Sequence, residues 1–177
     1  MKIPKAALLL FTASLALGSV MEPVRPFVHP GINYSRADLE LMRERVQGGV
    51  EPWASASAEL RRQTPLDFDP RVFRHIISGP NSQPDSGGQE LRASARVAHA
   101  CALLWFITRE EAYAEKARAI LRAWDGGVWT FDENNTKLLA AQACDPFVNA
   151  AEILRHTWPR WEEADTALVT RLLMGTF

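Results

Sequence analysis

Two neighbouring amides, Asn134 and Asn135, and one indole, Trp129, fall in a segment that the sequence predicts to be a loop, residues 129–137. Paired amides can bind a carboxylate or sugar hydroxyls without adding charge, and polar side chains on loops often carry function. Asparagine also tolerates left-handed backbone, so turn formation is the alternative interpretation of the pair. Trp129 is free to stack on a sugar ring, whereas a tryptophan on a helical stripe usually belongs to the core. We predict that these three residues bind substrate.

His99 falls on a predicted helix among Ala98, Ala100 and Cys101. Histidine changes charge near neutral pH and can serve as a base or an acid. Two interpretations stay open: the ring faces a binding cleft, or it is a hydrogen-bonded histidine of the core. We count His99 among the substrate-binding candidates.

Acid–base chemistry on a sugar needs a proton donor and a proton acceptor that lie close together. The sequence contains single candidates for these roles but no evident pair. Tyr113 falls on a core stripe, and Tyr34 precedes a helix without an assigned role. Hydrolysis of a glycosidic bond would need two carboxylates that flank a cleft. The candidates Asp85, Asp132 and Glu133 form no obvious pair, so the catalytic residues stay unassigned.

The two cysteines, Cys101 and Cys144, have no neighbours at the spacing of a metal site. We expect no metal and no cofactor. An oxidising compartment would permit a disulfide between them, while the apolar surroundings of Cys101 fit a buried free thiol equally well.

Hydrophobic periodicity predicts an all-α chain. Ser35 caps the first helix, Asp38 completes a variant capping box, and Gly48 ends the helix. Asp145 caps the fifth helix, with Pro146 at its first position. No run alternates as a strand would. The remaining helices are expected at residues 52–62, 90–108, 110–124 and 162–174.

Two features suggest how these helices are organised. Residues 64–88 form a stretch too long to be an idle connector, and its part at 81–89 could cover a sugar groove as a lid. The motif AxxILR occurs at residues 117–122 and again 33 residues later, each time followed by a tryptophan. Such an offset is typical of a repeating helix pair and predicts stacked hairpins in a solenoid or a closed toroid. Chance similarity is the alternative.

The N-terminus has the pattern of a secretory signal peptide. Lys2 and Lys5 precede an apolar run, residues 6–20, in which small residues mark a cleavage site near Gly18. The run is shorter than a span of about 20 strongly apolar residues, and an uncleaved anchor is the alternative. We expect removal of residues 1–18, which leaves one domain, residues 24–177, in the periplasm or secreted and free of the membrane.

The charged residues indicate which kinds of molecule the chain can bind. The net charge of −1 gives no general attraction to nucleic acid. Only 4 lysines occur, so the positive charge is nearly all arginine. Arginine suits bidentate recognition of carboxylates, although surface salt bridges are the plainer role for most of these residues.

Three blocks follow one another along residues 27–177: FVHPGINYSRADLELMRERVQGGVEPW, ALLWFITREEAYAEKARAILRAW and LLAAQACDPFVNAAEILRHTWPRWEEAD. In their order and spacing they resemble the opening part of the alginate lyase domain family. Three positions depart from the family's pattern. Arg109 and Glu110 stand where Gly and Asp are usual, and Gln142 stands where Gly is usual.

The resemblance implies part of an α/α toroid and a polysaccharide lyase that cleaves anionic uronate polymers by β-elimination. The family's Asn, His and Tyr catalytic motifs have no counterpart before Phe177. We therefore expect this chain to be the N-terminal part of such a lyase, with little activity alone. A toroid glycoside hydrolase and a non-enzymatic helical-repeat binding module are the alternatives.

Overall fold

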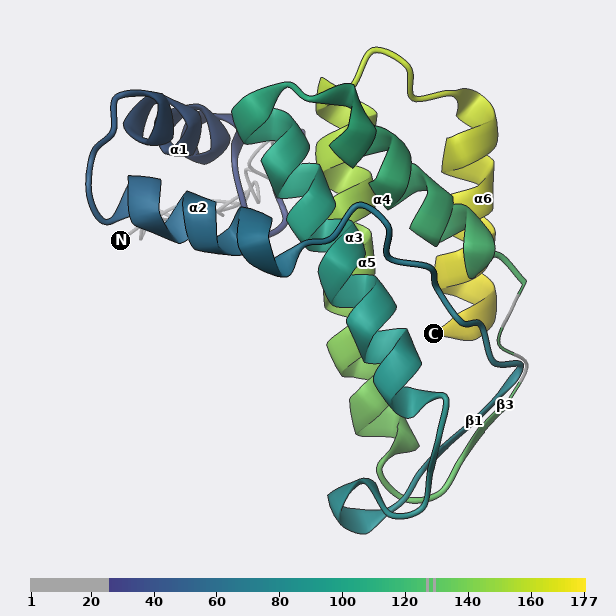
Figure 1. Ribbon diagram of the computed structural model, residues 1–177. Helices are drawn as coiled ribbons and strands as arrows, with labels where there is room; N and C mark the ends of the chain where they lie inside the picture. Colours follow the sequence, from purple (N-terminus) through teal and green to yellow (C-terminus); the bar gives the residue numbers. More distant parts are fainter. Residues whose placement is uncertain (1–25, 127, 129) are drawn as a thin grey trace, which may run out of the picture.

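The computed structural model describes residues 26–126, 128 and 130–177. The expected signal peptide lies outside these residues. Within them the chain is mostly helical, with a small three-stranded sheet at one end of the long helices (Figure 1). The helices are α1 (Arg36–Gln47), α2 (Trp53–Gln63), α3 (Gly88–Thr108), α4 (Glu111–Ala123), α5 (Thr136–Thr157) and α6 (Glu163–Thr176), and the strands are β1 (His75–Ser78), β2 (Asp85–Ser86) and β3 (Thr130–Asp132).

The first two helices form a hairpin that packs on α3. The predicted start of α1 is confirmed: the Ser35 hydroxyl accepts from the Asp38 backbone N–H, and the Asp38 carboxylate accepts from the Ser35 backbone N–H. This reciprocal cap satisfies two backbone donors at the helix start. Leu39, fully buried, ties the helix to the core.

The long helices α3 and α5 lie side by side and run in the same direction, while α4 and α6 return on one side of them (Figure 1). A strand of the sheet precedes each long helix, and a returning helix follows it. The chain therefore contains two units with this order of elements, one from β1 to α4 and one from β3 to α6. The AxxILR motif lies on the returning helix α4 in the first unit and on the leading helix α5 in the second. The expected 33-residue unit is therefore wrong as a structural repeat.

The sheet corrects the expectation that no strand forms. β1 pairs with β2 antiparallel and with β3 in parallel, with Ile76 opposite Phe131. Ile76 is fully buried, while the neighbouring His75 is exposed. The strands are only 4, 2 and 3 residues long. So short a run carries no recognisable period of two, and the pairing joins segments distant in sequence.

The predicted start of the fifth helix at Asp145 is also wrong, because α5 begins at Thr136 and continues through Pro146. A proline inside a helix removes one backbone hydrogen bond and normally ends or kinks the helix. Here Leu139 and Ala143 before the proline are buried together with Phe147 after it. Burial on both sides keeps the helix continuous where local sequence would end it.

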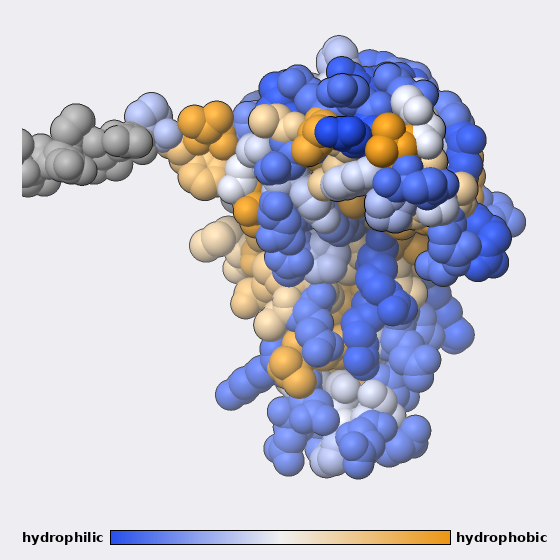
Figure 2. Space-filling view, turned by 90° about the vertical axis from the view of Figure 1, so that its left-hand side faces the viewer, coloured by the Kyte–Doolittle hydropathy of each residue, from blue (hydrophilic) through white to orange (hydrophobic). Residues whose placement is uncertain are grey.

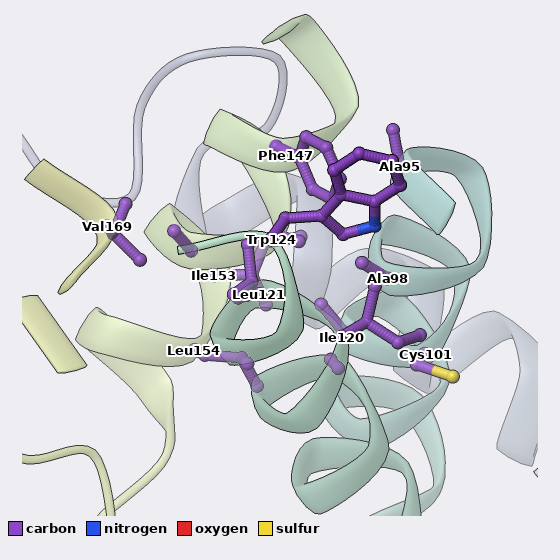
Figure 3. Packing of buried hydrophobic residues seen from close by; sticks show 14 of the residues in the cluster. Ala95, Ala98, Cys101, Ile120, Leu121, Trp124, Phe147, Ile153, Leu154 and Val169 are labelled. Carbon is purple, nitrogen blue, oxygen red and sulfur yellow. The ribbon is translucent and has the colours of Figure 1, made fainter. Parts of the chain in front are cut away.

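The core lies between α3, α4 and α5. Trp124, which ends α4, is fully buried and lies beside Phe147 of α5 and the alanines of α3, Ala95 and Ala98 (Figure 3). Alanines leave room for the indole, so one large side chain fills the space between three helices. Cys101 is buried in the same cluster.

Both cysteines are free thiols in the structure, which is one of the two states left open by the sequence. Burial raises the pKa of Cys101 to about 12, so its thiol is protonated and inert at neutral pH. Of the helices in the described residues, none has the length and apolar character needed to cross a bilayer.

We predict that Phe147→Ala lowers the free energy of unfolding by about 3–5 kcal/mol, because it leaves a cavity in the core. Leu138→Ala on the same helix is the control; its side chain is 59% exposed, and the expected loss is below about 0.5 kcal/mol. Urea denaturation followed by circular dichroism measures both. Equal losses in the two variants would contradict the core described above.

Candidate functional site

Three basic side chains follow one face of α3. Arg92, Arg96 and His99 are spaced four and three residues apart, which places them above one another on a helix. The buried residues of α3 occupy the opposite side, which packs against α4 and α5. Arg92 and Arg96 therefore face away from the core, whereas His99 is partly buried.

Two adjoining hollows run along this face and form one groove, because both are lined by Ala93 and Arg96. We call it the α3 groove. One hollow has a volume of about 530 Å³ and the other about 330 Å³. Figure 2 views the molecule from the α1–α2 side and shows hydrophilic residues running down the surface below that hairpin. The remaining lining residues are Ser82, Gln89, Glu90 and Arg92 in the first hollow and Leu60, Gln63, Thr64, Val97 and Ala100 in the second.

The two arginines of the α3 groove form no salt bridge with a described residue, although Glu90 lines the same hollow. Arg92 donates from Nε to the Gly88 carbonyl at 3.4 Å. In the described part of the chain, neither Arg92 nor Arg96 forms a salt bridge, although other arginines do. Arg122, for example, pairs with the buried Asp165 at 2.6 Å. Two guanidinium groups beside an open groove can therefore bind an anion from outside.

The ring of Tyr34 lies against His99, with the ring centroids 5.6 Å apart. The preceding residue fixes its position. Asn33 donates from its backbone N–H to Asn149 Oδ1 at 3.1 Å and from Nδ2 to the Asp145 carboxylate at 3.3 Å. Asn149 is 2% exposed, so this bond is sheltered from water and anchors residues 26–34, the N-terminal segment, on α5.

Burial and Asp145 set the protonation of this pair. Burial lowers the pKa of His99 below its ordinary value, and the Asp145 carboxylate opposes that shift. Burial also raises the pKa of Tyr34, and Asp145 adds to the rise. At neutral pH the imidazole is neutral and the phenol is protonated. However, His99 Nε2 is buried and has no hydrogen-bond partner among the described residues, so it does not face the groove as a base would.

The remaining predicted ligands lie elsewhere. Asn135 donates from its backbone to the Ser78 carbonyl at 3.1 Å and from Nδ2 to the Gly79 carbonyl at 3.0 Å, which ties the start of α5 to the sheet. Asn134 is exposed in the same turn. His99 lies 11 residues, or about 16 Å, beyond the start of α3, so the structure separates it from the amides. Trp129 is outside the described residues.

The carboxylates considered for hydrolysis organise the sheet region. Asp132 pairs with His75 at 3.1 Å, and Asp85 accepts from the Gln89 backbone N–H at 3.4 Å. Glu133 has a left-handed backbone with φ of 77° and accepts from the Thr136 hydroxyl through its carbonyl. These contacts give each residue a local structural role.

The α3 groove was missed from the sequence, although a signal was present. The spacing of Arg92, Arg96 and His99 indicates one face of a helix. What the sequence could not indicate is that this face stays open and that the two arginines lack acidic partners. Comparison of the chain with known protein families, with characterised proteins and with solved structures finds no match.

We predict that the pKa of His99 lies below its ordinary value of 6.5. NMR of the imidazole resonances during a pH titration measures it. Asp145→Asn should lower this pKa further, because the carboxylate favours the imidazolium. Asp125→Asn, at the end of α4, should leave it unchanged. As the pH falls below about 6.5, the unfolded chain binds a proton that native His99 does not, so His99 makes the fold less stable with acidification. A His99 pKa above 6.5 would contradict the buried site.

Proposed function

We propose that this chain is the polyuronate-binding part of a polysaccharide lyase that cleaves its substrate by β-elimination. The observation that supports the proposal best is the α3 groove with its two unpaired arginines. A polyuronate carries one carboxylate on each sugar, and guanidinium groups bind carboxylates through paired, charge-assisted hydrogen bonds. Arg92 and Arg96 lie one helical turn apart, which lets both act on one stretch of polymer.

The same contact would assist the chemistry. In β-elimination a base removes the C5 proton, the electrons form the C4–C5 double bond, and the C4–O bond breaks as the leaving oxygen gains a proton. Positive charge at the carboxylate stabilises the enolate-like intermediate. We assign no proton transfer to His99 or Tyr34, because His99 Nε2 is shielded. We propose instead that His99 supports the Tyr34 ring.

The resemblance to the alginate lyase domain family gains support from one backbone feature. Arg109 ends α3 with φ of 63°, a left-handed conformation that favours glycine, and glycine is usual at this position in the family. The parallel long helices with returning helices on one side also suit one segment of an α/α toroid. We propose that arrangement for the complete domain, and export to the periplasm or the exterior for the protein.

The two rival functions have weaker support. A glycoside hydrolase needs a pair of carboxylates with free access to the sugar. Asp145, whose charge acts on Tyr34, is bound by Asn33. A helical-repeat binding module would share the α3 groove but would cleave nothing.

An absorbance assay separates the three functions. The natural gene product is incubated with alginate and with polyglucuronate, and the near-ultraviolet absorbance of unsaturated uronates is followed. Growth of the absorbance is the expected result. New reducing ends without absorbance would indicate hydrolysis and overturn the lyase. Polymer binding with neither signal, across several polyuronates, would leave a binding module.

We predict that Arg96→Gln weakens binding of this chain to a polyuronate by about 10-fold, a loss of about 1.4 kcal/mol, because it removes one charge-assisted contact. Isothermal titration calorimetry measures the change. Arg171→Gln is the matched control. Arg171 lies on α6, away from the groove residues, and its guanidinium group already pairs with the Asp125 carboxylate at 2.7 Å. Carboxyl-reduced polymer should not bind. Equal affinity for native and carboxyl-reduced polymer would contradict recognition by the arginines.

A further inference from the structure

Two histidines and a glutamate meet where the N-terminal segment crosses α5, away from the residues that line the α3 groove. His29 Nδ1 lies 2.5 Å from Glu152 Oε1, and His156 Nε2 lies 3.5 Å from Glu152 Oε2. One possible ligand atom from each residue lies within 4.8 Å of the other two. Three side chains that commonly bind metal ions therefore converge on one point.

The fold explains the convergence. Glu152 and His156 are four residues apart on α5, so both project from one face of the helix. His29 comes from the N-terminal segment, which Asn33 anchors to Asn149 on the same helix. The ring of Phe27 packs edge-on against His29, with the centroids 4.7 Å apart. Two residues are thus fixed by the helix, and the third is delivered by an anchored segment.

One nitrogen of the cluster forms no hydrogen bond among the described residues. His156 Nε2 is buried and has no hydrogen-bond partner among the described residues. A buried polar atom without a partner carries a desolvation cost, which a bound cation would offset.

We propose that His29, Glu152 and His156 bind a divalent transition-metal ion, with zinc as the expected occupant. Two imidazole nitrogens and one carboxylate oxygen form a common zinc ligand set, and the fourth position is left to water. The imidazole rings now stack with centroids 4.2 Å apart and planes 8° apart. Both rings must turn out of this stack before their nitrogens can point at one ion.

The required movement is small. Ligand atoms around a tetrahedral zinc lie about 3.4 Å apart, whereas the present atoms lie within 4.8 Å of one another. His29 is exposed, so its ring has space on the solvent side in which to turn. The bound ion would join the N-terminal segment to α5 and so hold Tyr34 over His99 more firmly.

Zinc titration of this chain in the absence of any sugar tests the proposal, with calorimetry as the readout. One ion per chain should bind with a dissociation constant below about 10 µM. Zinc at 100 times that constant should raise the Tm by about 5–10 °C. Glu152→Gln, which keeps the shape of the side chain, and His29→Ala, outside the core, should each weaken binding by at least about 10-fold.

His75→Ala is the matched control, because His75 also faces a carboxylate, Asp132, but belongs to no such group of three among the described residues. It should bind zinc as the unaltered chain does. Cobalt substitution should give the visible absorption of a nitrogen- and oxygen-ligated ion, and this should be lost in Glu152→Gln. Absence of zinc binding, unchanged affinity in both cluster variants, or loss of binding in His75→Ala would overturn the proposal. The outcome of the zinc titration does not test polyuronate recognition, which the calorimetry with polymer measures separately.

Discussion

The close packing of α3 against α5 is the constraint on which the rest of the structure depends. The buried residues of α3 include Ala95 and Ala98, and α5 contributes Ala143 and Ala150. Small side chains allow two helices to approach closely, and the indole of Trp124 closes the space beside them (Figure 3). Because the two helices run in the same direction, the segments that precede them end at the same side and pair as β1 and β3 (Figure 1).

This packing leaves each long helix with a polar side of its own. On α3 that side carries Arg92 and Arg96, which line the α3 groove. On α5 it carries Asp145, Asn149 and Glu152, whose spacing of four and three residues places them on one face. The N-terminal segment lies on the α5 face and is fixed by Asn33. One helix pair therefore positions the groove, the Tyr34–His99 contact and the histidine–glutamate cluster.

Local chemistry made much of the helical structure predictable. The Ser35 cap, the glycines after α1 and the apolar stripes of α3 and α4 each act within a few residues, so the helix limits follow closely. The predicted start of α5 was wrong because it also rested on local chemistry alone. Asp145 followed by Pro146 satisfies the rules for a helix start, and only the burial of Leu139 and Ala143 overrides them.

The sites depend on contacts that local patterns cannot encode. Asn33 and Asp145 are 112 residues apart in sequence, and His29 and Glu152 are 123 apart. The strands are too short to show alternation. The sequence left two interpretations of His99 open, a ring that faces a cleft and a hydrogen-bonded histidine of the core. In the structure the ring packs against Tyr34, and Nε2 is buried without a hydrogen-bond partner among the described residues, so neither interpretation holds in full. The role of Arg92 and Arg96 depends on which neighbours they lack, which only the fold reveals.

We propose that an anionic sugar polymer binds along α3. The most direct measurement is the change in backbone amide NMR shifts when a short uronate oligomer is added to the isotope-labelled chain. We expect the largest changes on α3 between Gln89 and Ala100, and on Gln63 and Thr64, which line the same groove. Changes confined to α6, or none at saturating oligomer, would contradict it.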